Sequence, residues 1–294
     1  MLALICFLAG GLLGWGAARG STTVRQIWPV ALRIQILATS ATLSLVAVWR
    51  LTSWAELAGP VVLSGGMWVM FAAAQLTRRG ESAGEGALEA WAVSPNSGFW
   101  VVPTATAFGG AAGAMMAVLA NMITTAWTTV CIHLLRRDAP TRQRRATSWV
   151  DQAPILASLV ALVLLMVEPA PTWTHEVLTL AGPLLAFSGA ALYVGSVIHP
   201  HNVEVSRSDR ARRRWTRLTL VRVGYYLAVV GVALLVSSPT LAVVAALSGL
   251  SAPSFQPAQL ALLYGYRSGV VMTAARWGWV LAPFGLGLAA LVRG

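Results

Sequence analysis

The sequence predicts an all-α membrane protein with about ten transmembrane helices, and three observations lead to this prediction. Of the 294 residues, 57% are apolar and only 11% are charged, whereas a soluble domain carries roughly 25% charged residues. The apolar residues gather into runs of about 20, the length that a helix needs to cross the hydrocarbon core. Arginine residues cluster on alternate loops between these runs, which is typical of membrane proteins.

Ten apolar runs are long enough to be spans. The fourth and ninth are interrupted by proline and polar residues, so their helices are expected to be the least regular. The first run has no basic residue before it, and we therefore expect a spanning helix there rather than a cleaved signal peptide. The predicted spans cover residues 2–18, 28–49, 55–76, 88–108, 111–135, 149–167, 175–198, 215–236, 240–263 and 269–292.

The loop charges give an orientation to these spans. All 21 basic side chains are arginine, and nearly all of the loop arginines fall on the odd-numbered loops, with Arg50 as the exception. Because cytoplasmic loops carry the excess of positive charge, we expect a multi-pass protein of the cell inner membrane with both termini outside. The odd loops hold Arg19, Arg25, Arg78, Arg79, Arg136, Arg137, Arg142, Arg144, Arg145, Arg207, Arg210, Arg212, Arg213, Arg214 and Arg267.

Several function classes are disfavoured by the same composition. The net charge of +11 does not indicate a nucleic-acid partner, because the arginines lie in short loops rather than on a polar face with a soluble core behind it. The two cysteines, Cys6 and Cys131, lie inside apolar runs and are expected to be free thiols. No nucleophile–base pair or metal-ligand cluster converges, so we expect no enzyme, no metal and no cofactor.

The chain is expected to consist of two halves. Residues 1–137 form a first five-helix repeat, 138–148 an arginine-rich cytoplasmic linker, and 149–294 a second five-helix repeat. Halves with an odd number of spans enter the membrane in opposite directions, and such inverted repeats recur in secondary transporters. A short internal match supports the repeat: Ser97-Gly98-Phe99, Phe108-Gly109, Gly113 and Met116 correspond in spacing to Pro253-Ser254-Phe255, Tyr264-Gly265, Gly269 and Met272.

The two interrupted runs are the strongest functional indication in the sequence. Residues 94–103 and 251–259 each contain two prolines. Proline removes a backbone donor and clashes with the preceding turn, so a regular helix is disfavoured there. Irregular backbone at membrane depth is tolerated where it lines a cavity. Matched interruptions in two halves therefore predict broken, crossing fourth and ninth helices that form a transport site.

The expected ligand at this crossing is an anion. The N-terminal ends of half-helices present unpaired N–H groups and partial positive charge. The structural alternative is that the prolines only kink the helices and the polar side chains form hydrogen bonds with nearby backbone groups. Arg276, in the tenth span, either neutralises an anionic substrate or extends to the membrane interface. The expected substrate-binding residues are Asn96, Ser97, Gly98, Pro103, Pro253, Ser254, Gln256 and Gln259.

At these residues the sequence resembles the auxin efflux carrier family of membrane transporters. The family carries a motif of the form Asn-Thr-Gly-Phe-Leu-Gly-Ile-Pro late in its first half. The similar stretch here departs from it at Val101, which stands where the family has its second glycine. The second-half similarity consists of Pro253-Ser254 followed by Tyr264-Gly265. The first stretch reads Asn96-Ser97-Gly98-Phe99-Trp100-Val101-Val102-Pro103, and the opening Gly10-Gly11-Leu12-Leu13-Gly14 is also similar to the family's first helix.

This resemblance implies ten helices in two inverted five-helix halves, with two broken helices crossing at a central site. It places Asn96, Pro103 and Pro253 at that crossing. Members of the family move organic anions such as auxin or dicarboxylates. We accordingly expect an alternating-access carrier of a small organic anion. The partners expected are this substrate and the lipid bilayer, and a homodimer is left open.

Two other functions remain as alternatives. One is an ion-coupled carrier similar to the bile-acid symporters, and the other is a membrane assembly subunit that transports nothing. No Asp or Glu lies at the centre of a predicted span, so a carboxylate relay for protons or sodium has no obvious member. Arg222 lies near the cytoplasmic end of a predicted span, and we expect its side chain to extend to the interface.

Overall fold

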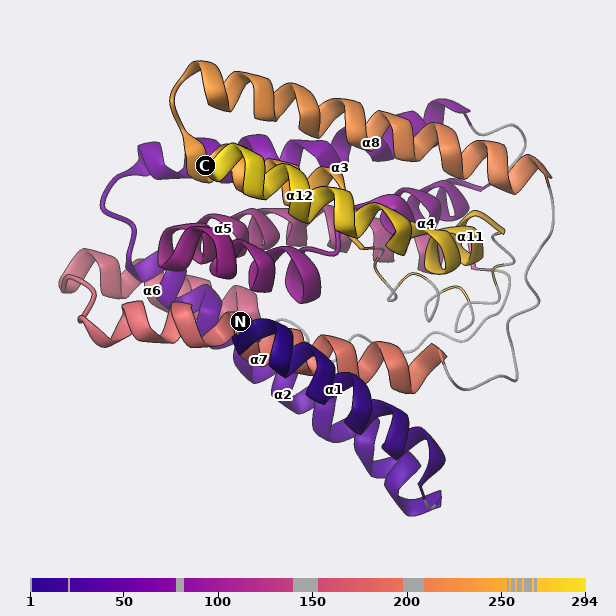
Figure 1. Cartoon of the computed structure of the whole chain (residues 1–294), viewed down its shortest axis with the longest axis horizontal. Coiled ribbons are helices and arrows are strands. Elements are labelled where there is room, and N and C mark those ends of the chain that lie inside the picture. The colour runs from indigo at the N-terminus through magenta and orange to yellow at the C-terminus, as the bar shows by residue number, and fades with distance from the viewer. Residues whose placement is uncertain are drawn as a thin grey trace. The chain divides into compact units, whose positions relative to one another are not determined.

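Every regular element in the described part of the chain is a helix (Figure 1). The structure is a computed structural model, and it describes residues 2–20, 22–77, 82–139, 153–197, 209–252, 254, 257, 261, 266 and 269–294. The chain forms two compact units, each built from three separate stretches of sequence. Unit 1 contains residues 1–58, 97–122 and 147–202, and unit 2 contains residues 59–96, 123–146 and 203–294.

Within the described residues, three helical stretches are long and apolar enough to cross a membrane: Trp54–Thr77, Ser97–Arg137 and Asp209–Leu235. Large apolar side chains are also strongly exposed on several helices, among them Leu12, Met166 and Leu235. An exposed apolar surface of this kind is stable against lipid rather than water. The protein is therefore helical and membrane-associated, while the full set of ten spans stays a prediction.

Unit 1 is built around helices from both predicted halves. Its helices are α1 (Leu2–Arg19), α2 (Thr22–Trp49), η1 (Trp54–Leu57), the π-helix η2 (Ser97–Val101), the first part of α5 (Val102–Arg137), α6 (Ala153–Val167) and α7 (Trp173–Val197). Helix α1 packs along α7, and α2 packs against α6 and α7. Two polar contacts tie the end of α2 to the segment before α7 and to the first turn of α7. Trp49 Nε1 donates to the Glu168 carbonyl at 2.9 Å and Arg50 Nη1 to Thr174 Oγ1 at 3.0 Å.

Helix α5 reverses direction at Gly110, where φ is 60° and ψ is −147°. Side chains are strained in this backbone region, and glycine is not. The segments on either side of the turn then approach closely, since a Cβ on Gly113 would lie 2.4 Å from the Ala105 carbonyl oxygen. The turn falls between residues 108 and 111, where the sequence predicts the fourth span to end and the fifth to begin.

Replacing Gly110 with alanine is expected to lower the free energy of unfolding by about 2 kcal/mol, because the backbone would be held in a strained region. A Cβ at this position meets no atom within 4 Å, so the cost comes from the backbone alone. Gly109→Ala is the matched control, because its Cβ also meets nothing and its backbone is helical. Thermal unfolding in detergent measures both, and equal melting of the two variants would contradict the strain.

Unit 2 also combines helices from both predicted halves. Its helices are α3 (Ala58–Thr77), α4 (Ala83–Val93), the second part of α5, α8 (Asp209–Leu235), α9 (Pro239–Gly249), α11 (Gly269–Trp277), η4 (Gly278–Leu281) and α12 (Ala282–Arg293). Helix α8, orange in Figure 1, packs against α4, α9 and α11, and α12 packs against α9. Two neighbouring tyrosines fasten α8 to α3. Tyr226 Oη donates to the Leu63 carbonyl at 2.9 Å and Tyr225 Oη donates to the Val62 carbonyl.

The short helices α4 and α9 correspond in length and position. Each has 11 residues. The first residues of the two helices, Ala83 and Pro239, are 156 positions apart, and so are their last residues, Val93 and Gly249. The internal sequence match has the same separation, between Gly109 and Gly265. Every residue of α4 after Ala83 is buried except Glu85, which is half-buried. Almost all of α9 is buried as well. Both short helices thus belong to the interior of unit 2.

Candidate functional site

The first interruption of regular structure lies directly after α4. The helix ends at Val93, and Ser94 adopts an extended conformation with φ −66° and ψ 157°. The Ser94 backbone N–H and side-chain hydroxyl both donate to the Ala90 carbonyl, at 3.0 and 2.6 Å, which satisfies one of the carbonyls that a helix end leaves without a partner. Pro95 follows, and the helix cannot continue through it. Helical structure resumes at Ser97.

The second interruption lies directly after α9. That helix ends at Gly249, and Leu250 departs from helical geometry with φ −112° and ψ 32°. Ser251 and Ala252 are non-helical and fully buried. Ser254 is also non-helical and is half-buried. Both chain breaks therefore fall where the sequence predicts interrupted runs, each at the C-terminal end of an 11-residue helix.

The two interruptions contact each other inside unit 2. The backbone N–H of Asn96 donates to Ser251 Oγ at 3.3 Å, across 155 positions of sequence. Both residues are buried, Asn96 with 7% of its surface exposed. Backbone groups freed by the end of one helix are thus satisfied by a side chain at the end of the other, as buried polar groups require.

Arg222 joins the same two segments. Its Nη1 donates to the Val93 carbonyl at 2.7 Å and its Nη2 to the Ser251 carbonyl at 3.4 Å. Only 3% of the residue is exposed. The expectation that Arg222 extends to the membrane interface is therefore wrong. Packing of α8 against α4 and α9 turns this side chain inward, where the carbonyl oxygens at the two helix ends replace the water that a guanidinium otherwise binds.

The electrostatics of this contact are favourable for a cation. Each helix C-terminus carries roughly half a negative charge, so two such ends offset about one positive charge. Among the residues that the structure describes, no carboxylate forms an ion pair with Arg222, and its Nε has no hydrogen-bond partner. The guanidinium is thus held by helix ends and keeps one donor that no described group uses.

Helix α4 is held at its N-terminal end as well. Ser82 caps the helix by accepting a hydrogen bond from the Glu85 N–H at 3.1 Å. Asp138 Oδ2 accepts from the Gly84 N–H at 3.0 Å. The hydrogen bond from the Arg137 side chain lowers the pKa of the Asp138 carboxyl below its ordinary value, and the Gly84 N–H adds to this effect. The carboxylate is therefore charged at neutral pH and complements the positive end of α4.

Helix α4 also carries a buried carboxylate, Glu89. Glu89 has 3% of its surface exposed and forms an ion pair with Arg214, from Oε2 to Nε, at 2.7 Å. Glu89 was not among the expected site residues, because it lies at the start of the predicted fourth span and not at its centre. The sequence does contain a signal for Glu89: it is the single acid in the apolar stretch 87–93, and an acid in such a stretch requires a partner.

The remaining expected residues of the first half belong to unit 1. Ser97 and Gly98 begin the π-helix and are half-buried. Pro103 is buried in the first turn of α5. A proline is compatible with a first turn because the N–H that it lacks would have no helical partner there. The interruption is therefore shorter than the sequence predicts and ends before Pro103.

Of the expected substrate-binding residues in the second half, only Ser254 lies in the described part of the chain. Pro253, Gln256 and Gln259 fall outside the described residues. Arg276 lies in α11, but the structure does not describe its side chain. The structure therefore brings together Asn96, Ser251 and Arg222, of which the sequence indicated only the first as a site residue.

Metal chemistry has no candidate in the described ranges, since no group of three or more His, Cys, Asp or Glu side chains gathers there. No protein-family model matches the sequence, and no curated protein is significantly similar to it. Functional inference therefore depends on the contacts of the two interruptions.

Proposed function

We propose that the protein is a secondary transporter that moves a small organic anion across the membrane by alternating access. The substrate binds in unit 2, beside the interruptions that follow α4 and α9. In this proposal the chain is a multi-pass protein of the cell inner membrane with about ten spans and with both termini outside.

The observation that carries the proposal is the meeting of two chain breaks in a buried, polar contact. Ending a helix in the interior leaves carbonyl groups that need partners. Here Arg222 donates to the Val93 carbonyl and the Asn96 N–H donates to Ser251 Oγ, each across more than 120 positions of sequence. A bundle whose only role is structural has no use for such a break at matched positions of two helices. Carriers use broken helices to present backbone groups to a solute.

The unused donor at this contact favours an anion. The helix ends offset the charge of Arg222, but its Nε has no hydrogen-bond partner among the described residues. A carboxylate that accepts from this donor would form a charge-assisted hydrogen bond, which is roughly twice as strong as a neutral one.

The division into units supports a carrier built from two inverted repeats. The first two predicted spans of each half, α1 and α2 together with α6 and α7, belong to unit 1. The following helices of each half, α3 and α4 together with α8 and α9, belong to unit 2. This equal partition, and the 156-position correspondence of α4 and α9, are what a duplicated five-helix unit would produce. Alternating access requires two such bodies that move relative to each other.

An ion-coupled mechanism of the bile-acid-symporter type is less well supported. Coupling cations in carriers bind to unwound carbonyl groups and to half-helix C-terminal ends. In this chain the Val93 and Ser251 carbonyls already accept hydrogen bonds from Arg222. A guanidinium cannot be deprotonated or exchanged during transport, so it occupies this position permanently.

Replacing Asn96 with alanine is expected to lower anion flux by at least about tenfold, since a lost substrate hydrogen bond costs about 1.5 kcal/mol. The backbone contact to Ser251 survives, because Asn96 donates it from its main chain. Flux is measured in vesicles that contain the purified protein, with a panel of labelled mono- and dicarboxylates. Asn121→Ala, at a half-buried position of α5 in unit 1, is the matched control.

Two outcomes would contradict the proposal. One is that the wild-type protein moves none of the carboxylates above the rate of empty vesicles. The other is that Asn96→Ala and Asn121→Ala transport equally well at equal abundance in the membrane. A fall in abundance of the Asn96 variant alone would instead assign a structural role to this side chain.

A further inference from the structure

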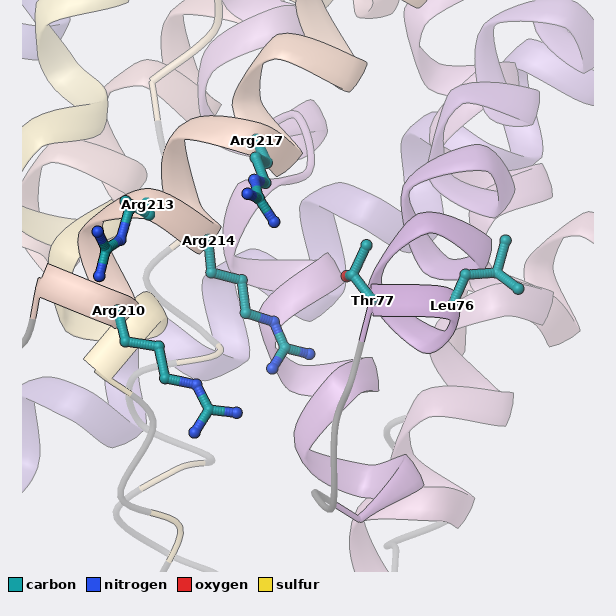
Figure 2. Close-up of a pocket in the computed structure, with 6 residues that line it drawn as sticks. All are labelled: Leu76, Thr77, Arg210, Arg213, Arg214 and Arg217. Carbon is teal, nitrogen blue, oxygen red and sulfur yellow. The ribbon is translucent and has the colours of Figure 1, made fainter.

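A second polar feature of unit 2 lies away from the interruptions, at the beginning of α8. Four arginines and the last turn of α3 line a cavity of about 420 Å³ (Figure 2). Pockets for small ligands span about 300–1,000 Å³, so the cavity has the size of a ligand site. It is lined by Leu76, Thr77, Arg210, Arg213, Arg214 and Arg217.

The arginines form one stripe on α8. Their spacing follows the pattern i, i+3, i+4 and i+7, which places side chains on a single helix face. Figure 2 shows the four side chains extending from α8, with Arg214 and Arg217 directed toward Thr77. Arg212 belongs to the same turns of α8 but does not line the cavity. Selective clustering on one face distinguishes this set from an arginine-rich segment that serves only to orient the chain.

The protein's own acids satisfy part of this charge. Glu89 pairs with Arg214. Burial raises the pKa of the Glu85 carboxyl above its ordinary value, and the charge of Arg210 opposes part of this rise. Asp209 is exposed beside the stripe. Arg213 and Arg217 are both exposed, and no described carboxylate pairs with either of them. The cavity therefore retains an excess of positive charge on two guanidinium groups.

The geometry points to a binding site for a phosphate group, and we propose that it takes the headgroup phosphate of an anionic phospholipid. Guanidinium groups match the tetrahedral oxygens of phosphate with paired hydrogen bonds. Leu76 stands at the edge of the same cavity with 86% of its surface exposed. The cavity thus offers the two kinds of surface that a phospholipid requires, cationic for the headgroup and apolar for the acyl chain.

The position of the cavity along α3 and α8 agrees with a phospholipid as the ligand. Helix α3 ends at Thr77 and α8 begins at Asp209, and both belong to stretches capable of crossing a membrane. The cavity is therefore at the level where these helices leave the hydrocarbon core. The arginine bias predicts that this side is cytoplasmic, and anionic lipids are concentrated in the cytoplasmic leaflet. This inference does not depend on transport and can fail independently of it.

The test measures thermal unfolding of the purified full-length protein in a nonionic detergent, with phosphatidylglycerol or phosphatidylcholine added. Phosphatidylglycerol is expected to raise the melting temperature of the wild-type protein by about 5 °C, and phosphatidylcholine by much less. The double variant Arg213→Gln/Arg217→Gln is expected to lose most of this rise. Arg212→Gln, which removes a charge from the same helix outside the cavity, is expected to keep it.

Inorganic phosphate and glycerol phosphate distinguish a phospholipid headgroup from a free phosphate compound as the ligand. Protection by the lipid alone supports a headgroup bound together with its acyl chain. Protection by the soluble phosphates to the same extent supports the phosphate site and assigns it to a free ligand. The proposal is overturned if no phosphate compound protects the wild-type protein, or if the double variant and Arg212→Gln respond equally. Both altered residues of the double variant are exposed, so unchanged melting without lipid verifies its fold.

Discussion

Substituting methionine for Arg222 is expected to lower the free energy of unfolding by about 3 kcal/mol. The substitution removes the donors for the Val93 and Ser251 carbonyls, and each hydrogen bond to a charged group contributes about 1.5–3 kcal/mol. Relief of the buried charge offsets part of the loss. Methionine has a comparable length and no polar atom that could replace the guanidinium, so both carbonyls remain buried without a partner.

Thermal or denaturant unfolding in detergent measures this effect. Arg212→Met is the matched control, because Arg212 is exposed on the same helix and is expected to change stability by no more than about 0.5 kcal/mol. Arg222→Lys should fall between the two, since an ammonium is a point charge and does not span two carbonyls as a planar guanidinium does. Equal stabilities of Arg222→Met and Arg212→Met would mean that Arg222 does not hold the two interruptions together.

Replacing Gly14 with valine is expected to cost about 3 kcal/mol, at the upper end of the range for overpacking a close contact. A Cβ at Gly14 would lie 2.3 Å from the Ala191 carbonyl oxygen, and one at Gly10 would lie 2.1 Å from the Phe187 carbonyl oxygen. Both obstacles are backbone atoms of α7, which no rotamer change can move. Two glycines four positions apart therefore allow α1 and α7 to approach closely, as small residues do in membrane helices.

Gly16→Val provides the comparison on the same helix. A Cβ at Gly16 meets no atom within 4 Å, so valine there changes only the intrinsic helix propensity, by less than about 0.5 kcal/mol. Unfolding of unit 1 is followed by the melting temperature of the full chain. If Gly14→Val and Gly16→Val melt together, the close contact between α1 and α7 contributes no measurable stability.

These two substitutions affect different units and should act independently. Arg222 lies in unit 2 and Gly14 in unit 1, and substitutions that share no contact partner usually give additive effects. Their consequences for transport should differ as well. Arg222 borders the proposed substrate site, whereas Gly14 contributes to the packing of α1 on α7. A loss of substrate affinity in detergent is therefore expected for Arg222→Met and not for Gly14→Val.

Much of the secondary structure could be predicted from the sequence because its causes are local. Apolar runs of sufficient length predict the helices, and the predicted boundary between the fourth and fifth spans coincides with the turn at Gly110. The breaks after Val93 and Gly249 follow from prolines and polar residues close by. Pro103 shows the limit of this argument, because a proline favours the start of a helix as readily as it ends one.

The candidate site could be predicted only in part, because its members come together through tertiary packing. Asn96 was expected at the site, since it lies in the interruption itself. Arg222 was assigned to the membrane interface, because an arginine near the end of an apolar run can extend outward or fold inward. Glu89 pairs with Arg214, which belongs to the opposite predicted half, and no local pattern connects them.

The helical, apolar character of the chain and its two corresponding interruptions can be predicted from the amino-acid order, because length, hydropathy and backbone chemistry act over a few neighbouring residues. Tertiary packing brings the two interruptions into contact, places Arg222 between them and gathers four of the arginines on α8 in a cavity with Thr77. The physical reason is that burial and hydrogen bonding of a charged side chain depend on which distant helices surround it. Arg222 remains in the interior because the Val93 and Ser251 carbonyls replace the water around its guanidinium.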